Sequence, residues 1–318
     1  MKTFQKTLIA AATGVVMLSA AGTASANSLL FPYFTTATGA QSVLTLSNTG
    51  TAGTVAGSVA THYVYNYGTA CTHYDATGLL TANDTLTHSI ADKTTAGGFG
   101  VAITGDTSKA VYFPSKDTEG FLVVSSKASG THTGTSTNAL RGSMVIVDPA
   151  SGLSVSYPGI DNGLNTSVAG NEGNFAAITD TAFPLNWLPS SMVTTSWYGV
   201  VAGDMSGKIA LGADWNGVAT FSNNGTVYDN EETAYSGTMS KAITCAGTIT
   251  PAHFMTGAQK DVLGTTKGGL VNATADMSVG GTGVVLMKMQ KVEAVVGAPF
   301  AGRLFMHREQ SAAVTTAH

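Results

Sequence analysis

Hydrophobic and polar residues alternate along this chain in short runs with a period of two, which is typical of β-strands. The longest run is 55–67, in which Thr61, Tyr63 and Tyr65 share one face and His62 and Val64 share the other. Polar turn clusters separate the runs, and this pattern predicts an all-β fold, a β-sandwich or a related architecture. The other predicted strands are 41–48, 99–103, 110–113, 121–126, 143–147, 153–157, 193–201, 208–211, 218–221, 237–243 and 283–292.

One segment departs from the alternation and predicts a short helix near residues 251-263. Thr250 can cap its first turn, Pro251 stands at the favoured first position, and Gly264 supplies a stop. We therefore expect a β-sandwich-like domain with one short helix. A single β-rich domain would cover 27–309, either as one unit or as two packed sheets or subdomains, and 310–318 would form a mobile tail.

The N-terminus has the three-part organisation of a secretory signal peptide. Lys2 and Lys6 form a basic region, an apolar core follows, and residues 24–26 read A-S-A, which matches the usual cleavage pattern. The apolar core is about half as long as the ~20 residues that a membrane-spanning helix needs. We therefore expect residues 1–26 to be removed and the mature protein, beginning near Asn27, to be exported to the cell surface or the medium.

Composition adds an expectation about the surface. Only 11% of the residues are charged, whereas ordinary globular domains carry about 25%. The net charge of −4 becomes −6 once the two lysines of the signal peptide are removed, and an acidic chain lacks the positive field that attracts nucleic acid. A β protein with a hydroxyl-rich surface of low charge has little repulsion between its copies. This favours contact with other copies or with cell-surface polysaccharide.

The mature chain has two cysteines, Cys71 and Cys245. In an exported protein such a pair usually forms a disulfide, and we predict one here. It would close a loop of roughly 170 residues, for which the loop-entropy treatment gives about 5 kcal/mol. Zinc binding is the alternative, but neither cysteine belongs to a C-x-x-C motif and the chain has no H-x-x-x-H spacing.

Candidate chemistry is sparse. Asp229, Glu231 and Glu232 could provide oxygen ligands to calcium, although a solvated acidic turn fits the same residues. His62 and His73 could approach each other across a hairpin, with structural roles favoured for both. The chain has no G-x-S-x-G elbow and no glycine motif in a phosphate-binding context. We therefore predict no catalytic residue and no cofactor other than calcium.

The aromatic residues allow two interpretations. They could stack on sugar rings, or they could form ordinary cross-strand packing. The residues concerned are Tyr63, Tyr65, Tyr67, Trp187, Trp197 and Trp215.

The first mature segment is strongly apolar. Pro32 argues against a central strand, so the segment is expected to be an edge strand or to dock elsewhere. Once freed at a new N-terminus, it could complete the sheet edge of a neighbouring molecule. The predicted assembly segment consists of Leu29, Leu30, Phe31, Tyr33 and Phe34.

The L-F-P pattern at 30–32, followed by T-L-S-N-T at 45–49, resembles a loose group of exported bacterial proteins. That group opens its mature region with L-F-P and continues with a strand that ends in S/A-N-T. The stretches at 71–75 and 243–245 are similar to some of its members. The resemblance implies a β-rich surface or secreted protein, and the composition is also similar to that of surface-layer subunits. Neither likeness transfers a function or a site residue.

Together these features favour a non-enzymatic structural protein of a Gram-negative cell exterior. Its copies would assemble into a layer, a filament or a matrix, which makes a homo-oligomer the expected state. A carbohydrate-binding or adhesion module is one alternative, and an outer-membrane β-barrel is another.

Overall fold

The computed structural model describes residues 28–37, 39–48, 59–81, 83–90, 118–126, 140–148, 153–164, 171–209, 211–292 and 304–309. Antiparallel strands dominate these residues, which confirms the all-β, sandwich-like prediction. The predicted signal peptide, the predicted strands at 99–103 and 110–113 and the tail at 310–318 lie outside the described residues.

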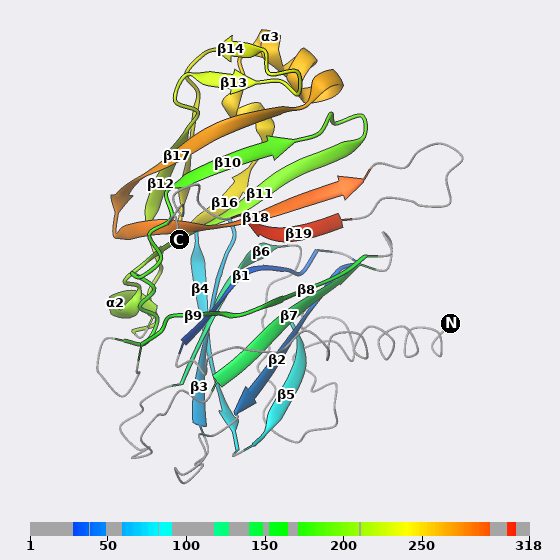
Figure 1. Cartoon of the computed structure of the whole chain (residues 1–318). Coiled ribbons are helices and arrows are strands. Elements are labelled where there is room, and N and C mark those ends of the chain that lie inside the picture. The colour runs from blue at the N-terminus through cyan, green and yellow to red at the C-terminus, as the bar shows by residue number, and fades with distance from the viewer. Residues whose placement is uncertain are drawn as a thin grey trace, which may run out of the picture.

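The strands form three sheets (Figure 1). A five-stranded sheet has the order β4-β3-β6-β1-β9 and contains β1 (Ser28–Thr35), β3 (Val59–Tyr67), β4 (Thr72–Leu80), β6 (Glu119–Ser126) and β9 (Ile160–Asp161). A four-stranded sheet has the order β5-β2-β7-β8 and contains β2 (Gln41–Asn48), β5 (Thr85–Ile90), β7 (Leu140–Asp148) and β8 (Leu153–Pro158).

The second half of the chain forms a ten-stranded sheet, which occupies the upper part of Figure 1. Its path is β14-β13-β17-β12-β15-β16-β11-β18-β19, and β10 pairs with β17 beside this path. The strands are β10 (Ala182–Trp187), β11 (Val193–Gly203), β12 (Val218–Ser222), β13 (Thr226–Tyr228), β14 (Ala234–Ser236), β15 (Ser240–Thr244), β16 (Ala246–Ile249), β17 (Gly269–Val279), β18 (Gly281–Val292) and β19 (Leu304–Glu309).

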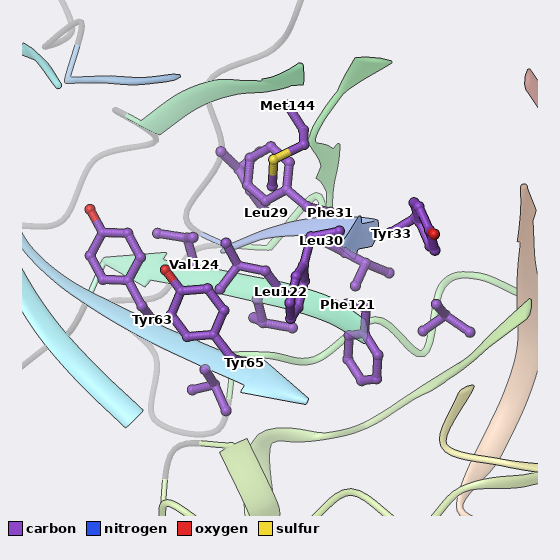
Figure 2. Packing of buried hydrophobic residues seen from close by; sticks show 14 of the residues in the cluster. Leu29, Leu30, Phe31, Tyr33, Tyr63, Tyr65, Phe121, Leu122, Val124 and Met144 are labelled. Carbon is purple, nitrogen blue, oxygen red and sulfur yellow. The ribbon is translucent and has the colours of Figure 1, made fainter. Parts of the chain in front are cut away.

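Strand β1 is the place where the three sheets meet. It pairs with β6 and β9 and also contacts β7 of the four-stranded sheet and β11 and β18 of the ten-stranded sheet. The strand pairing places Phe31, Leu122 and Tyr65 in one cross-strand row, and Met144 of β7 lies beside Phe31 (Figure 2). The ring of Phe31 also lies so close to Gly142 that a Cβ there would stand 2.9 Å from it.

Strand β1 lies between β6 and β9, whereas an edge strand was expected, but β9 pairs only with Leu29 and Leu30, so Pro32 lies beyond that pairing. The register of β1 against β6 shifts between Phe31 and Phe34, and this irregularity accommodates a residue that has no N–H to donate. The predicted assembly segment is therefore a buried strand in the core of the chain that carries it. Its members Leu29, Leu30, Phe31, Tyr33 and Phe34 are between 0% and 8% exposed.

The predicted helical segment is helical, but it is divided into three pieces. They are the 3₁₀ helix η1 (Pro251–Phe254), the α-helical turn α3 (Gly257–Gln259) and the π-helix η2 (Lys260–Lys267). Met255 is extended and ends the first piece, which lets both Phe254 and Met255 reach the core. The last piece passes Gly264, the predicted stop, and ends at Gly268, which has a φ of 71°.

A second difference concerns the predicted strand 208–211. Its first residues belong instead to a short helix, α2 (Ser206–Ile209). Asp204 precedes this helix, and its Oδ1 accepts hydrogen bonds from the N–H and the hydroxyl of Ser206 at 3.1 and 2.6 Å. This is an Asx turn, in which a side chain bonds the backbone two residues on and so competes with an extended conformation.

The buried apolar side chains form two groups. One lies within the ten-stranded sheet and includes Trp197 and Phe221. The other joins β1, β3 and β6 to residues of the second half, among them Phe175, Tyr198 and Trp215. Because this second group draws on both halves of the chain, the sheets share a core.

We expect Leu30→Ala to lower the free energy of unfolding by about 2–5 kcal/mol, because Leu30 is 0% exposed at the meeting point of the sheets. Urea denaturation followed by circular dichroism measures this change. Leu211→Ala makes the same substitution at a side chain that is 79% exposed, so it should leave the unfolding midpoint nearly unchanged. Equal effects of the two substitutions would contradict the central position of β1.

Candidate functional site

Five titratable side chains form a chain of alternating carboxylates and imidazoles: Glu172, His62, Asp75, His73 and Asp214. The Nδ1 atom of His62 lies 2.6 Å from Glu172 Oε1, and its Nε2 atom lies 2.9 Å from Asp75 Oδ1. The other oxygen of Asp75 lies 3.2 Å from Nε2 of His73, whose Nδ1 lies 2.6 Å from Asp214 Oδ1. We call this group the carboxylate–imidazole chain.

Strand pairing places the three central members. In the β3–β4 pair His62 lies opposite Thr77, and His73 lies opposite Asn66. Side chains two residues apart on a strand project from the same face, so His73 and Asp75 share the face of Thr77 and therefore of His62. Tyr63 and Tyr65 project from the opposite face, into the core.

The two outer carboxylates come from segments of the second half that the core holds in place. Gly173 N donates to Ser28 Oγ at 3.1 Å, which fixes the turn that carries Glu172. Asp214 precedes Trp215, whose buried indole N–H donates at 2.9 Å to a backbone carbonyl of β11. The carboxylate–imidazole chain thus joins the β3–β4 hairpin to two segments of the second half, which are held by Ser28 and by β11.

The carboxylate–imidazole chain runs from the interior of the protein to its surface. The side chains of His62 and Glu172 are 5% and 15% exposed, whereas that of Asp214 is 58% exposed. All four ring nitrogens face carboxylate oxygens. An ionised carboxylate only accepts hydrogen bonds, so the doubly protonated imidazolium is the form that satisfies all four contacts. The hydrogen bond from His73 is the main cause that lowers the pKa of Asp214 below its ordinary value.

Only part of this group is expected from the sequence. The approach of His62 and His73 across a hairpin was predicted, and the structure links them through Asp75. Glu172 and Asp214 were not predicted, because they lie 110 and 141 residues along the chain from their histidine partners. No local pattern marks either carboxylate, because tertiary packing alone brings it to its histidine.

The predicted disulfide between Cys71 and Cys245 is confirmed, with a Cα–Cα distance of 6.1 Å and a sequence separation of 174. Cys71 immediately precedes β4, and Cys245 lies between β15 and β16. The N–H of Cys245 donates at 2.6 Å to the carbonyl of Gly217, three residues after Asp214. The covalent link and the carboxylate–imidazole chain therefore attach the same end of the hairpin to the second half of the protein.

The acidic residues predicted as calcium ligands are held by protein donors. Asp229 Oδ1 accepts hydrogen bonds from the N–H groups of Glu231 and Thr233 at 2.9 and 2.8 Å. Its Oδ2 accepts from Tyr235 Oη at 3.2 Å and from Lys267 Nζ at 3.0 Å. Burial acts to raise the pKa of Asp229, but these hydrogen bonds outweigh it and lower the pKa to about 2.

The ammonium group of Lys267 takes the place beside these acids where a cation would lie. Its Nζ also donates to Glu231 Oε2 at 2.6 Å, whereas Glu232 is exposed with a φ of 64°. Across the described residues no group of three or more His, Cys, Asp or Glu side chains is arranged to hold a metal ion. Calcium binding at Asp229, Glu231 and Glu232 stays a prediction.

The aromatic residues considered for sugar stacking are mostly in the core. Tyr63, Tyr65 and Trp197 are 0% exposed, and Trp187 and Trp215 are 4% and 3% exposed. Most of their ring surface is therefore covered by other side chains. A surface depression of about 380 Å³ lies beside Asp229, and its lining consists of Asn186, Trp187, Leu188, Asp229, Asn230, Gly269, Leu270 and Gln290.

Comparisons with protein-family models, with curated proteins and with solved structures find no match for this chain. In the part of the chain that the structure describes, no helix is long and apolar enough to cross a membrane. The carboxylate–imidazole chain, the disulfide and the exposed surface are therefore the observations from which a function is inferred.

We expect the double substitution Cys71→Ser with Cys245→Ser to lower the free energy of unfolding by about 2–5 kcal/mol. Without the cross-link, the unfolded chain regains the conformational entropy that closing a long loop removes. Urea titration of the oxidised wild type and the variant measures this. Since the chain has only these two cysteines, a reducing agent should destabilise the wild type and leave the double variant unchanged. A response of the double variant to the reducing agent would contradict this assignment.

A further prediction concerns Asp229→Asn. A carboxyl whose folded pKa lies below its unfolded value stabilises the fold above the unfolded pKa, and the contribution is lost as the pH falls. The wild type should therefore melt at a higher temperature than the variant at pH 7, and the difference should shrink between about pH 4 and about pH 2. Glu232→Gln, at an exposed carboxyl, is the control and should show no such difference.

Calcium chloride added to the same samples tests the predicted metal site. A rise in the melting temperature of the wild type that is absent in Asp229→Asn would support calcium binding. An unchanged melting temperature at millimolar calcium would count against it.

Proposed function

We propose that this protein is a non-enzymatic structural subunit that is exported to the cell surface or the medium and assembles there with copies of itself. The observation that supports this most directly is the outer edge of β4. This nine-residue strand ends the five-stranded sheet, and among the described strands it pairs only with β3. Unpaired N–H and C=O groups on such an edge are a ready template for a strand of another molecule.

The direction of the free edge follows from one hydrogen bond. His73 N donates to Asp214 Oδ1 at 3.0 Å, so the N–H at this position points away from β3. Because the backbone groups of a strand alternate in direction, the N–H groups of residues 75, 77 and 79 also point outward. Thr77 is exposed and Leu79 is 42% exposed, so the second half of the strand carries no charge that would repel a neighbouring copy.

The partner that fits this edge is a second copy of the chain. Charged residues make up 11% of the sequence, so little repulsion opposes the approach of identical surfaces. The N-terminal segment 29–34 is less suitable than β4, because donating it to a neighbour would remove β1 from the core of its own subunit. Export of the chain rests on the signal peptide that the sequence predicts, and the disulfide fits an oxidising compartment.

The substitution Thr77→Pro tests the assembly edge. Proline removes the outward N–H and places its ring against an incoming strand, whereas the hydrogen bonds between β4 and β3 stay in place. We expect the protein concentration needed for assembly to rise about tenfold or more, which corresponds to the loss of about one hydrogen bond and its surroundings. Light scattering coupled to size exclusion, together with electron microscopy of the mature protein, measures it.

Thr77→Val is the matched control, because valine keeps the N–H and the β-branched shape. It should assemble as the wild type does, and both variants should retain the disulfide and the wild-type circular dichroism spectrum. A wild type that stays monomeric at all concentrations, or a proline variant that assembles equally well, would contradict the proposal.

A further inference from the structure

We propose that the carboxylate–imidazole chain is a pH-operated latch, which ties the side chains of β3 and β4 to the second half of the protein in mildly acidic solution and loosens as the pH rises, while the disulfide keeps the end of the hairpin attached. The two histidines belong to the hairpin, and the outer carboxylates Glu172 and Asp214 belong to segments anchored by Ser28 and Trp215. Opening the latch therefore separates His62 from Glu172 and His73 from Asp214.

The latch depends on protons because of its composition. Three carboxylates and two imidazoles meet at distances of 2.6 to 3.2 Å. With both imidazoles protonated, every contact joins a donor to an acceptor and the opposite charges attract. When an imidazole loses a proton, one of its nitrogens presents a lone pair to a carboxylate at the same short distance. That contact turns from attraction to repulsion, and the partly buried carboxylates of Glu172 and Asp75 lose a countercharge.

The charged groups around the latch set the direction of the effect. Glu172 and Asp75 face His62, Asp75 and Asp214 face His73, and Lys208 of α2 acts electrostatically on Asp214. The latch is complete where the carboxylates are ionised and the imidazoles are protonated. It weakens as the pH rises through the histidine range. The lowered pKa of Asp214 keeps its end intact further into acid.

The latch also covers part of the β4 edge. Asp214 Oδ1 accepts both the ring Nδ1–H of His73 and the outward backbone N–H of the same residue. Closing the latch thus occupies the first outward donor of the edge, and opening it frees that donor. This consequence for assembly rests on the proposed function, whereas the latch itself does not.

Hydrogen exchange of the mature, disulfide-bonded protein tests the latch in dilute solution, where assembly plays no part. The protection factor of a peptide covering residues 68–80, corrected for the intrinsic effect of pH on exchange, is measured between pH 5 and pH 8. If opening releases one proton, protection should fall about tenfold per pH unit across the histidine range. Strand β12, in the interior of the ten-stranded sheet, is the internal reference and should keep constant protection.

Two variants assign the effect. In His73→Gln, protection of β4 should be lower at pH 5 and nearly independent of pH. Asp214→Asn alters an exposed side chain, so it gives the same answer if the histidine variant fails to form its disulfide. His253→Gln and Asp276→Asn change residues that do not belong to the carboxylate–imidazole chain. Both should keep the wild-type dependence of β4 protection on pH. Constant protection of β4 in the wild type, or an unchanged slope in both latch variants, would overturn the latch and leave the assembly proposal untouched.

Discussion

Burial of β1 is the interaction on which the other features of the molecule depend. The strand pairs with β6 and β9 and presents side chains to β7, β11 and β18, so it supplies apolar contact to all three sheets. Its first residue also acts at the candidate site. Ser28 Oγ lies 2.8 Å from Ser125 Oγ, beside His62 in the strand pairing, and accepts the N–H of Gly173. The burial of β1 therefore positions the turn from which Glu172 reaches His62.

The central position of β1 also bears on the predicted export signal. Cleavage after residue 26 would leave Asn27 as the only residue before Ser28, which is 0% exposed. A new N-terminus would thus stand directly at the start of the strand that completes the core. The disulfide would form in the same oxidising compartment in which β1 becomes free to pack. In this interpretation export, completion of the core and covalent closure of the β3–β4 hairpin belong to one maturation process.

The sequence predicts the regular part of this fold and misses the parts that tertiary contacts decide. Strand β2 was predicted with its observed bounds, because residues 41–48 alternate and lie between glycines. Strand β17 was missed because its buried positions include Ala273 and Ala275, which carry little strand preference. Strand β4 was missed because Asp75 and Gly78 are depleted in strands. Nothing in the local sequence distinguishes Glu172 and Asp214 from other carboxylates, because only the tertiary fold brings each of them to a histidine.

Strand β4 combines a protected half and an unprotected half of one sheet edge. Edge strands in natural proteins are often protected by charged side chains, and His73 and Asp75 are charged positions of this kind. Here Asp75 contacts His62 of β3 and His73 contacts Asp214, so both side chains tie the strand to other parts of the same chain. Among the described residues, no such contact is made by the remaining half of the edge, which includes Thr77 and Leu79. In the proposed assembly, a strand fixed at one end and open at the other would guide a neighbouring copy without being exchanged itself. The carboxylate–imidazole chain would then define where pairing between copies begins.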